Sequence, residues 1–164
     1  AGVEMNTGAL GHGLAIGVGL AIAAKKMGQD YRTYVLMGDG ELAEGSIWES
    51  AMAAGHYKLD NLCAIVDRNH LQISGCTETV MTLEDLKGKW QMFGFEVIEI
   101  DGNNYEEIIN AFTQAKAIKN KPSLILANTV KGKGVSFMEN QASWHHGVLD
   151  AVQYKQALME LGDL

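Results

Sequence analysis

The chain has 164 residues, with 20 acidic against 13 basic side chains and a formal net charge of −7. This length suits one domain with an apolar core, and a content of 47% hydrophobic and 20% charged residues excludes wholesale disorder. The excess of acidic residues excludes a generic nucleic-acid binder. The lack of a long uninterrupted apolar run excludes a membrane span. Two cysteines are too few for a disulfide framework and fit a reducing cytoplasm.

Segments typical of helices and strands alternate along the chain. Residues 9–28 are rich in Ala, Leu and Ile and end on Gly28, which predicts a buried helix. Residues 32–37 are short and apolar and lead into a Gly-Asp-Gly turn, which predicts a strand that meets a loop. The remaining expected elements are a helix at 45–57, a strand at 62–67, a helix from Thr82 to Phe93, a strand at 95–100, a helix at 106–119, a strand at 123–128 and a helix at 151–161.

Strands that are separated by helices of about 10–15 residues indicate βαβ units. We therefore expect an α/β fold, with a doubly wound, mostly parallel sheet and helices on both faces, in a single domain spanning 1–164. Ligands of such sheets bind at the carboxyl ends of the strands. The candidate chemistry then lies in the loops at 38–45, 67–75, 101–104 and 129–146.

Two of these strand ends carry oxygen ligands. Asp39 lies between two glycines after the first strand, and Asn69 follows the second strand. The glycines allow backbone amides to approach an anion, and a carboxylate with an amide oxygen, a backbone carbonyl and diphosphate oxygens makes the octahedral shell that Mg²⁺ prefers. The helix from about Gly45 can direct its free amides at the same diphosphate. An isolated Gly-Asp-Gly is more often a plain β-turn, so this interpretation depends on the matching Asn69.

The Gly-Asp-Gly at 38–40, followed after 28 residues by Asn69, resembles the thiamine-diphosphate motif of thiamine enzymes. Residues 38–75 are similar to the diphosphate-binding domain of transketolases, in the short forms found in bacteria and archaea. The similarity continues through 7–21, 130–147 and the closing helix, so it covers essentially the whole chain. It implies the thiamine-diphosphate-binding fold, with thiamine diphosphate and Mg²⁺ as cofactors.

The resemblance also implies roles for individual residues. The side chains of Asp39 and Asn69 would coordinate Mg²⁺, with the backbone carbonyl of Leu71 as the third protein ligand. The amide of Gly40 would donate to the diphosphate. The cofactor-binding residues that it implies are Gly8, Ala9, Leu10, Gly38, Asp39, Gly40, Asn69 and His145, of which the first three would meet the aminopyrimidine end.

Glu44 and the loop at 131–134 also match family features. The family has a glutamate at the position of Glu44, in a hydrogen-bonded carboxylate chain between active sites at the dimer interface. An exposed glutamate in the first turn of a helix, favoured by the helix dipole, explains Glu44 almost as well. The Lys-Gly-Lys-Gly loop at 131–134 matches a family loop that folds over the cofactor.

The histidines nearest the expected substrate are His145 and His146. Family members have one histidine after the equivalent of Trp144, near the diphosphate and the sugar, where an imidazole can donate a hydrogen bond or move a proton. This chain has two in succession, and we expect His145 to be the active one, with His146 as the alternative. His70 stands where the family motif frequently closes with a second Asn and is interpreted as structural.

The glutamate that activates the aminopyrimidine belongs, in the family, to a separate pyrimidine-binding domain that nothing here resembles; Glu41 is not assigned that role. The family also has histidines upstream of residues 7–10, so the chain is expected to be N-terminally incomplete, either as a subunit or as a piece of a longer chain. We expect it to be inactive alone and to need a C-terminal transketolase subunit, with self-association into a heterotetramer acting on sugar phosphates. The alternatives are another thiamine enzyme, such as a deoxyxylulose-phosphate synthase, and a non-catalytic cofactor-binding module.

Overall fold

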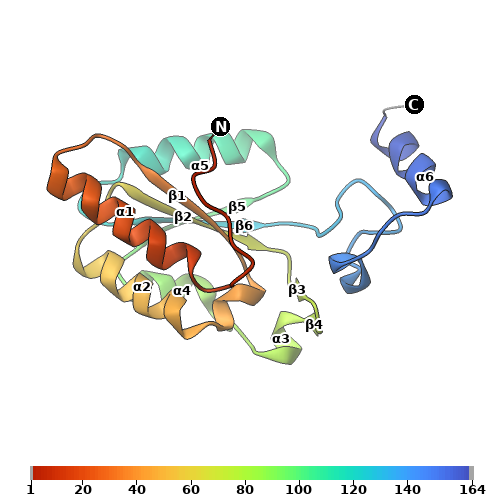
Figure 1. Cartoon of the computed structure of the whole chain (residues 1–164), viewed down its shortest axis with the longest axis horizontal. Coiled ribbons are helices and arrows are strands. Elements are labelled where there is room, and N and C mark those ends of the chain that lie inside the picture. The colour runs from red at the N-terminus through yellow and green to blue at the C-terminus, as the bar shows by residue number, and fades with distance from the viewer. Residues whose placement is uncertain (1, 163–164) are drawn as a thin grey trace.

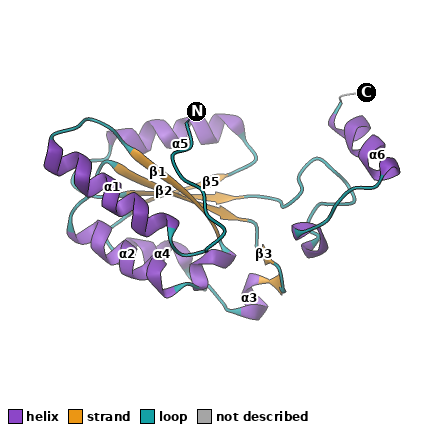
Figure 2. Cartoon of the chain, viewed as in Figure 1, coloured by secondary structure: helices purple, strands orange, loops and turns teal. Residues whose placement is uncertain are grey.

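Four parallel strands form the central sheet in the computed structural model, which describes residues 2–162 (Figures 1 and 2). Their order in the sheet is β1-β2-β6-β5. A short antiparallel pair follows β2 and stands outside this sheet. The strands are β1 (Thr33–Gly38), β2 (Leu62–Arg68), β5 (Glu96–Asp101) and β6 (Ser123–Asn128), and the antiparallel pair is β3 (Leu71–Gln72) with β4 (Gly75–Cys76). The expected doubly wound, parallel α/β fold is confirmed.

Helices cover the two faces of the sheet unequally (Figure 2). One face carries α1 (Gly13–Met27), α2 (Gly45–His56) and α4 (Leu86–Met92), whose apolar side chains form the larger core cluster with those of β1, β2 and β6. The other face carries α5 (Tyr105–Ala117), which packs on β5 and β6 around a smaller cluster. Helices lie on both faces, as expected, but only a single described helix covers the second one.

The second face is open above β1. Leu36 of β1 is 73% exposed, and Tyr34 beside it is also exposed. A shallow apolar groove of about 200 Å³ runs from Leu36 past Ile65 and Ile125 to Phe112 of α5. Strands of parallel sheets are normally covered on both faces, and the apolar side chains of β1 are suited to such burial. Within residues 2–162, no helix covers this part of the strand.

Two helices begin later than the sequence pattern predicts. The first begins at Gly13 instead of residue 9, because Gly11 adopts a left-handed φ of 85° that a helix cannot contain. The helix expected from Thr82 begins at Leu86, because Asp85 is the residue whose side chain caps it, by accepting a hydrogen bond from the amide of Gly88. Thr82 instead directs its hydroxyl to Glu78.

Three short helical segments were not expected from the sequence. They are η1 (Gly40–Ala43), α3 (Thr77–Val80) and η2 (Ala142–His145). Each is only four residues long, which is too short for periodicity to reveal it.

Residues 129–162 form an arm that leaves the carboxyl edge of the sheet and extends away from it (Figure 1). The arm contains η2, which lies against β3, and the last helix α6 (Ala151–Leu161). The bounds of α6 agree with the prediction because both ends are capped: Asp150 and Gln153 form a capping box, and Gly162 adopts the left-handed conformation. Within residues 2–162, no helix has both the length and the apolar character needed to cross a membrane.

Two helical glycines give a matched test of the packing. A Cβ on Gly55 of α2 would lie 1.9 Å from the backbone oxygen of Phe93, whereas a Cβ on Gly19 of α1 would meet nothing within 4 Å. We expect Gly55→Ala to lower the free energy of unfolding by about 1–3 kcal/mol through overpacking, and Gly19→Ala to raise it by about 0.5–1 kcal/mol through helix propensity. Urea denaturation of the two variants measures both, and a stabilised Gly55→Ala variant would contradict the packing described here.

Candidate functional site

The parallel pairing of β1 with β2 brings the two motif loops together. The register places Gly38 opposite Asp67, and the amide of Asp39 donates to the carbonyl of Asp67 at 3.2 Å. Asp39 therefore lies beside the end of β2, with Asn69 two residues beyond Asp67. Both Asp39 and Asn69 are buried, and Asp39 is only 1% exposed.

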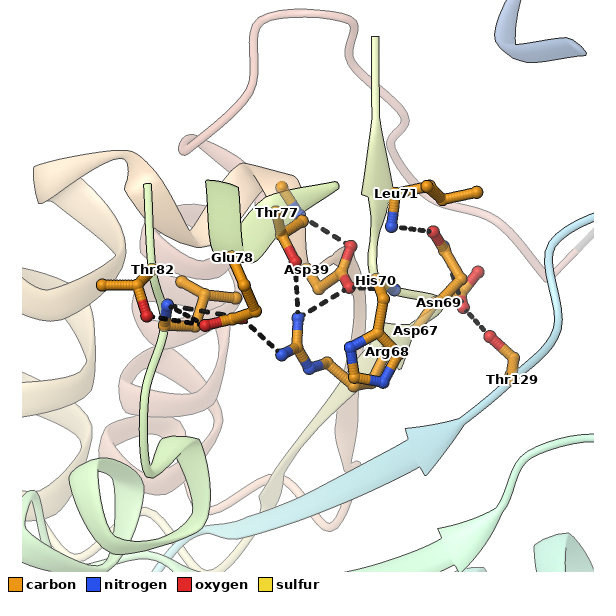
Figure 3. Close-up of polar contacts among 12 residues, drawn as sticks. Asp39, Asp67, Arg68, Asn69, His70, Leu71, Thr77, Glu78, Thr82 and Thr129 are labelled. Carbon is orange, nitrogen blue, oxygen red and sulfur yellow. Dashed lines mark hydrogen bonds and ion pairs between the residues drawn. The ribbon is translucent and has the colours of Figure 1, made fainter. Parts of the chain in front are cut away.

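Three donors hold the carboxylate of Asp39 (Figure 3). Its Oδ1 accepts a hydrogen bond from the amide of Gly40 at 2.8 Å. Its Oδ2 accepts from the amide of His70 at 2.7 Å and from Nη1 of Arg68 at 3.0 Å. Buried carboxylates need such compensation, and here most of it falls on one of the two oxygens.

Arg68 joins Asp39 to the segment that follows β4. Its Nη1 also donates to the hydroxyl of Thr77 at 2.9 Å, and its Nη2 donates to Oε1 of Glu78 at 2.6 Å (Figure 3). The hydroxyl of Thr82, followed by Arg68, lowers the pKa of Glu78 to about 2. Glu78 therefore stays ionised at any pH near neutrality, and its pairing with Arg68 is lost only as the pH falls toward 2.

A second set of hydrogen bonds fixes the amide group of Asn69. Its Oδ1 accepts from the amide of Leu71 at 3.0 Å, and its Nδ2 donates to Oδ1 of Asp67 at 3.2 Å. Asp67 also accepts a hydrogen bond from the hydroxyl of Thr129 (Figure 3). The residue between Asn69 and Leu71, His70, has a left-handed φ of 64°, which produces the tight turn that these contacts require.

This donor set suits a hard divalent cation. Asp39 and Asn69 offer carboxylate and amide oxygens, and the second lone pair of each Oδ1 is not used by the hydrogen bonds above. No group of three or more His, Cys, Asp and Glu side chains within residues 2–162 is arranged to hold a metal ion, so a cation here depends on Asn and backbone oxygens as well. Such all-oxygen sites favour Mg²⁺ or Ca²⁺ over zinc or copper. The Leu71 carbonyl as third ligand remains a prediction.

The segment of Gly8, Ala9 and Leu10 is exposed and is tied to the site by Glu41. The carboxylate of Glu41 accepts hydrogen bonds from the amide of Gly11 at 2.9 Å and from the amide of Gly38 at 3.3 Å. Gly11 is buried, and its carbonyl accepts from the hydroxyl of Ser46 at 2.7 Å. The side chain of Glu41 thus links the segment just before α1 to the Gly-Asp-Gly turn.

Gly40 approaches β3 closely. A Cβ added to it would lie 2.8 Å from Cβ of Gln72, so a side chain at this position would push β3 away. Glu44 is exposed at the junction of η1 and α2, and its side chain makes no capping hydrogen bond. The contact of the Gly40 amide with a diphosphate and the interface role of Glu44 remain predictions.

His145 and His146 lie at the end of η2 on the arm, and both are exposed. Their rings meet edge to face, with centroids 4.7 Å apart. Desolvation, and then the charge of Lys131, lower the pKa of His145 below its ordinary value, which favours a neutral imidazole. Because η2 lies against β3, these histidines are on the side of the molecule that carries Leu71.

Comparison with known proteins assigns this arrangement to a family. Residues 1–163 match the family described as "Transketolase, thiamine diphosphate binding domain". This chain belongs to the transketolase family. The resemblance noted in the sequence is therefore confirmed, and so is the thiamine-diphosphate-binding type of domain.

Curated relatives are similar over almost the whole chain. A subunit of the apulose-4-phosphate transketolase from Phocaeicola vulgatus is 57% identical over 162 residues, which are 99% of this chain and 58% of the relative. A 6-deoxy-6-sulfo-D-fructose transketolase subunit from Clostridium sp. is 46% identical over 98% of this chain and 58% of its own length. The chain thus spans about 58% of the length of these relatives.

Solved transketolase structures have the same fold. The transketolase of Campylobacter jejuni superposes with a TM-score of 0.92 at 40% identity, over 98% of this chain and 26% of that one. A transketolase from Pichia stipitis in complex with sedoheptulose 7-phosphate has a TM-score of 0.91 at 34% identity, over 98% of this chain and 25% of that one.

The sequence patterns did not indicate four side chains that organise this site: Glu41, Asp67, Arg68 and Glu78. Asp67 and Arg68 lie next to a motif residue at the end of a buried strand, where a charged side chain rarely remains unpaired. Their position at the end of a buried strand could therefore have indicated that Asp67 and Arg68 have partners in the site. Glu41 and Glu78 resemble ordinary surface glutamates until the fold supplies their partners.

The Glu41 contacts can be tested by one substitution. Glu41→Gln keeps the shape but replaces one accepting oxygen by a donor, so one of the amides of Gly11 and Gly38 loses its partner. We expect the free energy of unfolding to fall by about 1–3 kcal/mol and residues 2–12 to become more sensitive to protease. Glu49→Gln, at an exposed carboxylate of α2, is the matched control and should change neither. Equal protease sensitivity in both variants would refute the anchoring role of Glu41.

Proposed function

We propose that this chain is the diphosphate-binding part of a transketolase, which binds Mg²⁺–thiamine diphosphate and transfers a two-carbon ketol unit from a ketose phosphate to an aldose phosphate. The observation that carries the proposal is that buried Asp39 and buried Asn69 follow two adjacent parallel strands at the same edge of the sheet, in a chain whose fold superposes on a transketolase. Ligands of parallel α/β sheets bind at this edge, and Asp39 and Asn69 each keep an Oδ1 lone pair there that a cation can use.

The charges around Asp39 support a requirement for metal. Asp39, Asp67 and Glu78 are three carboxylates, and within residues 2–162 Arg68 is the one guanidinium that pairs with any of them. This edge of the sheet would repel a diphosphate by itself. A divalent cation between Asp39 and the diphosphate removes that repulsion, so we expect cofactor binding to depend on Mg²⁺.

Residues of this chain would hold the cofactor from several sides. Asp39, Asn69 and the carbonyl of Leu71 would bind the Mg²⁺, and Gly40 would face the diphosphate. Gly8, Ala9 and Leu10, anchored through Glu41, would meet the aminopyrimidine end. When bound, thiamine diphosphate supplies the nucleophilic thiazolium carbon that takes up the two-carbon unit.

The arm would provide the groups that act on the sugar. A neutral His145 can donate a hydrogen bond to a sugar hydroxyl or accept its proton, and the lowered pKa keeps it in that form. His146 is close enough to His145 to take over this role. Lys131 and Lys133 of the loop at 131–134 add positive charge where a sugar phosphate would enter.

The proposal includes a partner. Several relatives are named as single subunits of a transketolase, which suggests a split enzyme whose second chain carries the pyrimidine-binding domain and the activating glutamate. We expect the chain to be inactive without that second chain and to assemble with it as a heterotetramer. The relatives also suggest donors beyond the common pentose phosphates, such as apulose 4-phosphate or a sulfonated deoxyfructose. A deoxyxylulose-phosphate synthase is the alternative reaction, and its product would distinguish it.

Loss of the metal ligand tests cofactor binding. Asp39→Asn keeps the volume of the side chain but removes the charge that a cation needs, so we expect Mg²⁺-dependent binding of thiamine diphosphate to fall below detection. Calorimetric titration of the native assembly, with and without Mg²⁺, measures this. Asp30→Asn, at an exposed carboxylate in the loop before β1 and so at the opposite edge of the sheet, is the control and should bind as the unchanged protein does. Unchanged affinity in Asp39→Asn would remove Asp39 from the site.

The reaction is tested on the assembly that co-purifies with this chain from its source. We expect thiamine-diphosphate-dependent ketol transfer from xylulose 5-phosphate, apulose 4-phosphate or 6-deoxy-6-sulfofructose to an aldose phosphate, with activity only when a second chain is present. His145→Ala should lower kcat at least about tenfold with little change in cofactor affinity. If His146→Ala causes the loss instead, the active histidine is His146. A partner without ketol transfer would retain the fold and reject the reaction.

A further inference from the structure

Arg68 is a buried cation beside the residue that would bind a metal ion, and the proposed function does not explain it. Its side chain is 9% exposed, and that of Asp39 is 1% exposed. A guanidinium placed there repels an incoming Mg²⁺, so electrostatics alone would argue against it. The arrangement needs a benefit that offsets the repulsion.

The contacts divide the two oxygens of Asp39 into different roles. Oδ2 accepts from both Arg68 and His70, and two hydrogen bonds use its two lone pairs. Oδ1 accepts only from the amide of Gly40 and retains a lone pair. A cation can therefore bind Asp39 through one oxygen but not through both.

Arg68 cannot easily leave this position because it is held from its far side. Its Nη1 is shared between Asp39 and Thr77, and its Nη2 is bound by Glu78 at 2.6 Å. Glu78 is itself fixed, since its Oε2 accepts from the hydroxyl of Thr82 and from the amide of Leu83. The planar guanidinium thus has a single orientation, in which it occupies Oδ2.

We propose that Arg68, oriented by Glu78, is a positioning residue that restricts Asp39 to one coordinating oxygen and so makes the site prefer Mg²⁺ to Ca²⁺. Mg²⁺ requires a regular octahedron of oxygens at short distances, to which a carboxylate contributes one atom. Ca²⁺ is larger, takes about six to eight oxygens and readily binds both atoms of one carboxylate. When Oδ2 is blocked, Asp39 cannot bind a cation through both oxygens, and only Ca²⁺ loses affinity from this. This inference rests on the proposed function, because it takes Asp39 as the metal ligand.

The test measures selectivity and does not depend on activity. Dissociation constants of Mg²⁺ and Ca²⁺ are measured by calorimetry on the native assembly in the presence of thiamine diphosphate, and their ratio is compared among variants. Arg68→Met removes one of the two donors to Oδ2 and leaves the amide of His70, so one lone pair of Oδ2 becomes available to a cation. We expect the preference for Mg²⁺ to fall about tenfold, the scale of other changes beside metal ligands. Glu78→Ala leaves Arg68 in place but unanchored, and should lower the preference in the same direction by a smaller factor.

The double variant separates positioning from a general loss of stability. Because Glu78 acts through Arg68, Arg68→Met with Glu78→Ala should have the same selectivity as Arg68→Met alone, whereas independent structural damage would add. Glu96→Ala is the matched control: Glu96 pairs with Lys121 at the same 2.6 Å on the surface, and its loss should leave the ratio unchanged. If Arg68→Met fails to fold, Glu78→Ala alone decides.

The possible failures are distinguishable. Equal Mg²⁺ and Ca²⁺ affinity in the unchanged protein, or ratios within about twofold of it in both single variants, overturns the role of Arg68 while leaving Asp39 as the ligand. Absence of any metal-dependent binding of thiamine diphosphate in the unchanged protein overturns the proposed function itself.

Discussion

A carboxylate removed from water must find compensating donors, and at Asp39 this requirement organises the whole carboxyl edge of the sheet. The donors come from three directions: the next residue along the chain, the turn after β2, and a guanidinium at the last position of β2. Each of them fixes a different loop. Because Arg68 also reaches Glu78, even α3, which lies outside the sheet, is connected to the same carboxylate.

The parallel pairing of β1 and β2 brings the donors and Asp39 to the same edge of the sheet. Residues separated by nearly thirty positions meet because both strands end at the same edge. The helices that cover one face supply most of the core, and the other face supports α5 and leaves part of β1 open. The packed layer therefore lies beneath the site, while the arm that carries the histidines meets the carboxyl edge of the sheet through Thr129 and Val130 and contacts β3 through η2. In the proposed function, the loops at the sheet edge bind the diphosphate and the arm contacts the sugar.

The sequence predicts the long elements well, because their apolar periodicity and their caps are local properties. The helix at 151–161 and the strand at 123–128 agree with the structure at both ends. The sequence pattern could not predict backbone geometry at single positions. The left-handed conformation of Gly11 shortens α1, and four-residue helices such as α3 are too short to show a periodic pattern. The motif identified Asp39 and Asn69 correctly as neighbours at one edge. It could not reveal that Glu41 would hold Gly11 or that Arg68 would bridge two carboxylates, because both depend on the meeting of distant segments.

The left-handed turn at His70 bears on how this position can evolve. The family motif frequently has a second Asn here, and the side chain of His70 is exposed, while its backbone amide is what contacts Asp39. Asn, Asp, His and Gly tolerate a φ near 64°, whereas β-branched residues do not. The position is therefore open to drift among a few residue types and closed to the rest by backbone geometry. An exchange of Asn for His here changes an exposed side chain and leaves the backbone contact with Asp39 in place.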